Sequence, residues 1–122
     1  MSRLLVCCLF CFFSCGDPSP AAPPTAYDVS QERFREMLGE EEVVLLDVRT
    51  PAETAEGMIE GAREIDFKAD DFAARIDSLD RDKTYLVYCR SGNRSGKACA
   101  LMDELGFEHR YNLEGGYLNW EE

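Results

Sequence analysis

The stretch from Tyr85 to Ser95 carries the residues that could do covalent chemistry in this chain. Tyr85 to Tyr88 predicts a buried strand, and Cys89 stands at its end. Six polar or small residues follow, the last at the start of a predicted helix: Arg90, Ser91, Gly92, Asn93, Arg94 and Ser95. Such a loop can point several backbone N–H groups at one anion, and a helix N-terminus adds positive potential. Both favour a thiolate, so the sequence predicts a reactive Cys89 rather than a structural cysteine.

The arginines of this loop predict an anionic substrate. Arg90 and Arg94 can each bind an anion through two N–H groups. The chain as a whole has a net charge of −11, so an anion would be attracted only by these local cations. The same net charge argues against a nucleic-acid partner, because phosphate binding needs a basic face.

A second candidate group lies at the end of another apolar run. Val43–Leu46 is typical of a strand buried on both faces, and Asp47 and Arg49 follow it. In open α/β sheets the carboxyl ends of the strands are where ligands bind. The two residues could support the active site or form a structural ion pair, and the sequence does not separate these interpretations. We assign neither a proton-transfer role.

The remaining cysteines and histidine predict neither a metal site nor a disulfide framework. Only Cys89 and Cys99 lie in the part of the chain predicted to fold, no CxxC pair comes with histidine partners for zinc, and His109 is the only histidine. No organic cofactor is indicated either.

The N-terminus predicts export and lipid attachment. Leu4–Phe13 is an apolar run too short to span a bilayer, so residues 1–14 are predicted to be a signal peptide. The following residues resemble a bacterial lipobox, which predicts cleavage before Cys15 and lipidation of Cys15. Phe12, three residues before Cys15, stands where leucine is usual in a lipobox. The alternatives to lipidation are ordinary signal-peptide cleavage near the same place or an uncleaved anchor. The expected location is the bacterial cell envelope, lipid-anchored and facing the periplasm or exterior.

The rest of the chain divides into a tether and one domain. Residues 15–26 are rich in proline and predict an extended tether without a packing role. Residues 27–122 are expected to form a single domain in which strands alternate with helices. Strands are predicted at 43–46, within 59–65, at 85–88 and at 111–113, and helices after Ser30, around Glu53, at 70–79, at 95–105 and near Trp120. This α/β pattern predicts a parallel or mostly parallel sheet with helices on both faces.

The order and spacing of several motifs resemble the single-domain rhodaneses, a sulfurtransferase family. The matching residues are Leu45–Arg49, Glu53, Gly57 with Ile59 and Gly61-Ala62, Cys89–Ser95, and Leu113–Tyr117 with Trp120. The resemblance implies a five-stranded, mostly parallel sheet and a Cys89 persulfide formed from a small anionic sulfur donor. That donor would be thiosulfate or a polysulfide or persulfide, and the acceptor would be cyanide or a thiol. The resemblance does not identify a protein partner.

Three points qualify the resemblance. Tyrosine-type phosphatases place five residues between cysteine and arginine, whereas four separate Cys89 from Arg94, which disfavours a phosphatase or arsenate reductase. Met58 stands where the family often has histidine, so we expect altered donor preference or local stability. Cys99 could resolve the persulfide as a disulfide, although a plain helix residue is the preferred interpretation.

A non-catalytic module that carries sulfur or binds a partner is the alternative function.

Overall fold

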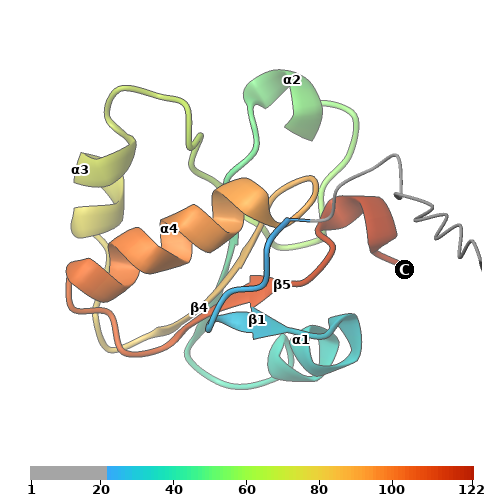
Figure 1. Ribbon diagram of the computed structural model, residues 1–122, viewed down its shortest axis with the longest axis horizontal. Coiled ribbons are helices and arrows are strands. Elements are labelled where there is room, and N and C mark those ends of the chain that lie inside the picture. The colour runs from blue at the N-terminus through green and yellow to red at the C-terminus, as the bar shows by residue number, and fades with distance from the viewer. Residues whose placement is uncertain (1–21) are drawn as a thin grey trace, which may run out of the picture.

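A computed structural model describes residues 22–122 of this chain (Figure 1). The predicted signal peptide, Cys15 and most of the predicted tether lie outside this range. Within it, no helix combines the length and the apolar character needed to cross a membrane.

Five parallel strands form one sheet in the order β1-β5-β4-β2-β3. Their bounds are Asp28–Val29 for β1, Val43–Asp47 for β2, Arg63–Glu64 for β3, Thr84–Tyr88 for β4 and Arg110–Leu113 for β5. Every pairing among the described strands is parallel, so the predicted α/β fold is confirmed and its sheet is wholly rather than mostly parallel.

The two central strands, β2 and β4, end at the same edge of the sheet, and the candidate site lies at that edge. β2 and β4 are almost continuously apolar because helices cover both faces of the sheet. Asp47 is in register with Tyr88, and Val48 N–H donates to the Tyr88 carbonyl at 3.0 Å. Asp47 and Cys89 therefore reach the same carboxyl edge, where α/β sheets bind ligands.

Helices cover both faces of the sheet (Figure 1). Helices α3 (Phe72–Asp77) and α4 (Asn93–Glu104) bury Phe72, Ile76 and Met102 on one face. Helix α1 (Gln31–Met37), which Ser30 caps, buries Phe34 and Met37 on the other. The short helices α2 (Pro51–Thr54) and η1 (Tyr117–Asn119) follow the carboxyl ends of β2 and β5.

Two details differ from the sequence-based expectation. Strand β1 was not predicted, because two residues are too few to show an alternating pattern. Helix α4 begins at Asn93 rather than Ser95, because Gly92 caps it in the left-handed region with φ of 97°. Asn93 and Arg94 consequently lie in the first helical turn, not in the loop.

Candidate active site at the Cys89 loop

The Cys89 sulfur lies at the carboxyl end of β4, beneath the start of α4. The residue is only 1% exposed. Gly92 N–H donates to its Sγ at 3.1 Å, and the buried Ser95 hydroxyl donates to it at 3.2 Å. A short loop that closes on the preceding strand thus aims one backbone donor and one side-chain donor at a single sulfur. Both donors are placed to stabilise negative charge that develops on this sulfur.

The chain after β5 holds this loop from the outside. Tyr117 N–H donates to the Cys89 carbonyl at 2.9 Å, and Leu118 N–H donates to the Arg90 carbonyl at 3.0 Å. Gly116 lies so close that a Cβ atom there would be 2.4 Å from the Arg90 carbonyl oxygen. A glycine is required at 116, because any side chain would displace the loop backbone.

The two arginines that the sequence predicts in the loop, Arg90 and Arg94, have different surroundings. Arg94 makes a bidentate ion pair with Glu53, with N–O distances of 2.8 and 2.9 Å. The hydrogen bond from Arg94 lowers the pKa of Glu53 to about 2, against the opposing effect of burial. Arg90 is exposed, and its guanidinium has no hydrogen-bond partner among residues 22–122. Arg90 is therefore the loop cation open to a substrate anion, whereas Arg94 would first have to leave Glu53.

Asp47 and Arg49 form a buried ion pair beside the loop, with exposures of 0% and 4%. Arg49 Nη2 lies 2.7 Å from Asp47 Oδ2 and 2.7 Å from the carbonyl oxygen of Gly57. The guanidinium also stacks over the Tyr117 ring, 4.3 Å from its centroid. The pair joins the end of β2 to the Gly57 turn and to the chain after β5, and neither residue hydrogen-bonds to Cys89. The geometry supports a bracing role.

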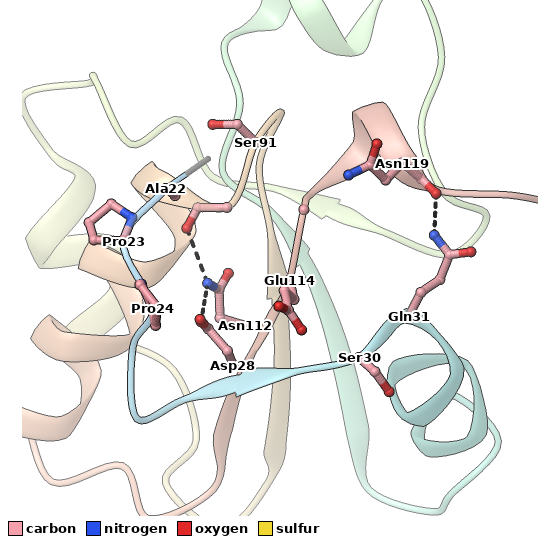
Figure 2. A pocket seen from close by; sticks show the side chains of 12 residues that line it. Ala22, Pro23, Pro24, Asp28, Ser30, Gln31, Ser91, Asn112, Glu114 and Asn119 are labelled. Atoms are coloured by element: carbon pink, nitrogen blue, oxygen red, sulfur yellow. Dashed lines mark hydrogen bonds between the residues drawn. The ribbon is translucent and has the colours of Figure 1, made fainter. Parts of the chain in front are cut away.

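Three pockets flank the loop in the described part of the chain. One, of about 340 Å³, is lined by Gly92, Asn93 and Lys97 on the side of α4 and by residues 23–25 and Tyr27. The other two have loop residues in their walls. One of these, of about 300 Å³, is lined by Arg49, Glu53, Glu56, Arg90, Tyr117 and Leu118. The other, of about 370 Å³, has no lysine or arginine among its described lining residues, and Ser91 and Gly92 form part of its wall (Figure 2). Arg90 makes the pocket that it lines the better approach for an anion. Of the remaining predicted loop residues, Ser91 is half-buried and Asn93 is exposed at the start of α4.

Cys99 lies on α4, fully buried in the apolar cluster of that face. Burial raises the pKa of the Cys99 thiol to about 12. The neutral thiol is a poor attacking group. The environment of Cys99 therefore supports its interpretation as a structural helix residue rather than as a cysteine that resolves the persulfide.

Sequence reasoning missed the Asn112 side chain, which contacts the loop. The Asn112 side chain donates from Nδ2 to the Gly92 carbonyl at 3.1 Å and to Asp28 Oδ1 at 2.8 Å (Figure 2). Its signal in the sequence is a polar residue within an otherwise apolar strand, between Tyr111 and Leu113. In the part of the chain that the structure describes, no cluster of three or more His, Cys, Asp or Glu side chains could hold a metal ion.

Comparison with known proteins places this geometry in one family. The family model for the rhodanese-like domain matches residues 30–122. YtwF of Bacillus subtilis is 40% identical over 95 residues, which cover 77% of this chain and 89% of YtwF. A sulfurtransferase of Allochromatium vinosum is 36% identical over 94 residues, covering 76% of this chain and 86% of that protein. The crystal structure of a rhodanese-like domain protein from Staphylococcus aureus superposes with a TM-score of 0.68 at 28% identity, over 78% of this chain and 91% of that one.

Not every relative is named for sulfur transfer. A tRNA uridine(34) hydroxylase of Cytophaga hutchinsonii is 35% identical over 99 residues, which cover 79% of this chain but 32% of that protein. Family membership alone therefore does not identify the reaction, which has to be inferred from the residues of the site. The match over residues 30–122 and the five-stranded parallel sheet show that this chain belongs to the rhodanese-like domain family.

Proposed function

We propose that this protein is a sulfurtransferase that carries a sulfane sulfur on Cys89 as a persulfide. Relatives named as sulfurtransferases support rhodanese-type sulfur transfer in general. The observation that carries the specific proposal is the Cys89 sulfur itself, which receives the Gly92 N–H and the Ser95 hydroxyl and lies beside the exposed Arg90.

The first half-reaction would load the enzyme. The Cys89 thiolate attacks the outer sulfur of thiosulfate, and a new S–S bond forms. The bond between the outer sulfur and the sulfonate sulfur breaks, and its electron pair leaves with sulfite. The Arg90 guanidinium, in the adjacent pocket, is placed to neutralise the donor's charge and the departing sulfite. A persulfide donor would react in the same way with a thiolate as leaving group, and a polysulfide donor would leave as a polysulfide anion shorter by one sulfur.

The second half-reaction would unload it. A cyanide ion or an acceptor thiolate attacks the outer sulfur of the Cys89 persulfide. The S–S bond breaks, and its electron pair returns to the Cys89 sulfur as a thiolate. Gly92 N–H and the Ser95 hydroxyl stabilise the charge that reappears on Sγ, so they lower the barrier for this step. The products are thiocyanate or an acceptor persulfide.

Initial rates with thiosulfate and cyanide varied together test the proposal. A covalent intermediate predicts ping-pong kinetics, with parallel lines in double-reciprocal plots. Intact-mass spectrometry should show the gain of one sulfur atom after thiosulfate and its loss after cyanide. A folded protein that gains no sulfur from thiosulfate or from polysulfide would contradict the proposal.

A non-catalytic sulfur carrier or partner-binding module is the second candidate. The 1% exposure of Cys89 favours it, because a sulfur this well covered would exchange slowly with free small molecules. A carrier would load one sulfur but would not turn over with cyanide in excess. A phosphatase or arsenate reductase has less support, because Arg94 is already paired with Glu53 and the loop lacks a second open arginine for an oxyanion.

We also propose that the mature protein is anchored in the bacterial envelope by a lipid on Cys15, facing the periplasm or exterior. The support is the sequence of residues 1–16. In cells, the wild-type protein should fractionate with membranes and be solubilised by detergent, and Cys15→Ser should move it to the soluble fraction. Equal membrane retention of the two would contradict lipidation.

A further inference from the structure

The Asn112 amide joins strands β1 and β5 to the loop that surrounds Cys89. The residue is 2% exposed, and its Nδ2 donates to two acceptors, the Gly92 carbonyl and Asp28 Oδ1 (Figure 2). The Gly92 carbonyl also accepts the first hydrogen bond of α4, from Gly96 N–H at 3.0 Å. Gly92 is thus held through its carbonyl from two sides, while its N–H donates to Cys89 Sγ at 3.1 Å.

Gly92 needs such a restraint. It is the residue with the greatest backbone freedom in the loop, and it adopts φ of 97°, which few other residues tolerate. It is also the loop residue whose backbone N–H bonds the sulfur. A flexible peptide that swings away would leave Sγ with the Ser95 hydroxyl as its hydrogen-bond donor. Fixing the Gly92 carbonyl therefore fixes a donor to the nucleophile.

The buried carbonyl oxygen of Asn112 supports this interpretation. Asn112 Oδ1 is buried and has no hydrogen-bond partner among the residues that the structure describes. A buried amide oxygen without a partner costs free energy, so the amide is held in this orientation by what its nitrogen contacts. A flipped amide would turn Oδ1 toward the Asp28 carboxylate and the Gly92 carbonyl, both of which are acceptors. Asp28 thereby fixes the orientation of the Asn112 amide.

Asp28 is itself held by the segment that enters the domain. Thr25 N–H donates to Asp28 Oδ2 at 2.9 Å, and the Thr25 hydroxyl donates to Oδ1 at 2.5 Å. Thr25 also packs on α4, where a Cβ added at Gly96 would lie 3.1 Å from Thr25 Cγ2. A continuous set of contacts therefore runs from Thr25 through Asp28 and Asn112 to Gly92.

We propose that Asn112, oriented by Asp28, is a positioning residue for the nucleophile: it holds Gly92 so that its N–H stabilises the Cys89 thiolate. The inference deepens the proposed sulfur transfer and rests on Cys89 being its nucleophile. Asn112 contacts neither the sulfur nor a substrate pocket on the Arg90 side. Its effect is transmitted through the Gly92 peptide.

The test is the pH profile of Cys89 alkylation by iodoacetamide, measured on the Cys89 peptide by mass spectrometry. Asn112→Leu keeps the number and branching of the side-chain heavy atoms and removes both N–H donors. We expect the midpoint of its profile to move about one pH unit higher, which is a tenfold lower thiolate fraction below the midpoint. The plateau at high pH reports the accessibility of the sulfur, so it is analysed separately. Asp28→Ala, which frees the amide to turn, should shift the midpoint in the same direction by less.

Leu38→Ala is the matched control. Leu38 packs against the cluster on the opposite face of the sheet, so this change lowers stability without reaching the loop. Its midpoint should equal that of the wild type. If folded Asn112→Leu and Asp28→Ala both keep the wild-type midpoint, the proposal is overturned. Alkylation involves no sulfur transfer, so the two claims can fail separately. If the protein forms no persulfide but the midpoint still shifts in Asn112→Leu, the proposed function is contradicted and the positioning role of Asn112 is supported.

Discussion

Cys89 and Cys99 are both almost completely buried, with exposures of 1% and 0%, yet their surroundings differ in kind. Cys89 ends a strand at the carboxyl edge of the sheet and receives a backbone N–H and a hydroxyl. Cys99 lies one helical turn beyond Ser95, among apolar side chains, and burial raises the pKa of its thiol to about 12. Burial alone therefore does not distinguish the two cysteines: the hydrogen-bond donors aimed at the Cys89 sulfur do.

The largest expected difference is between removing one cysteine and removing the other. Cys89→Ser should abolish persulfide formation, because the hydroxyl does not attack sulfane sulfur. Cys99→Ala should keep sulfur transfer near the wild-type rate and cost about 1 kcal/mol of unfolding free energy from the small cavity. Intact mass after thiosulfate and urea unfolding measure the two effects. Loss of sulfur transfer in folded Cys99→Ala would contradict the assignment of the chemistry to Cys89 alone.

Gly116→Ala should disturb the Cys89 side without touching Cys99. The added methyl group would overlap the Arg90 carbonyl, so the loop must move. We expect a loss of about 1–3 kcal/mol in unfolding free energy and a large fall in sulfur transfer. Gly106→Ala is the control, because Gly106 also has positive φ, at 90°, but a Cβ there meets nothing within 4 Å. Equal loss of transfer in both variants would show a general stability effect.

Ser95→Ala tests the hydroxyl donor on its own. Removing one hydrogen bond to a charged sulfur should lower the transfer rate roughly tenfold. Ser78→Ala, at an exposed serine that ends α3, should have no effect on transfer. Single-turnover kinetics with thiosulfate measure the loading step directly. An unchanged loading rate in Ser95→Ala would mean that the hydroxyl does not stabilise the thiolate.

The smallest expected effect concerns the ion pair that fixes Arg94 in α4. The pKa of Glu53 is lowered to about 2, so its contribution to stability is complete above its ordinary value of 4.5 and is lost as the pH falls toward 2. Glu53→Gln should cost about 1–2 kcal/mol at pH 7 and less at pH 2 to 3. Urea unfolding at several pH values measures this. A constant difference between wild type and variant across that range would contradict the assigned pair.

The parts that sequence could predict are those with a local pattern. Val43–Leu46 and Tyr85–Tyr88 are continuous apolar runs, and each became a central strand with a candidate residue at its end. The pairing of Arg94 with Glu53 and the bond from Asn112 to Gly92 join residues 41 and 20 positions apart. No short-range spacing encodes such contacts, so the open and the occupied arginine could not be distinguished in advance.

The most direct test of the central claim is to locate the transferred sulfur. The protein is loaded with thiosulfate, its persulfides and thiols are blocked with an alkylating reagent, and its peptides are analysed by mass spectrometry. The account predicts one additional sulfur on the peptide that carries Cys89 and none on the peptide that carries Cys99. Sulfur on Cys99, or on neither cysteine in a folded protein, would contradict it.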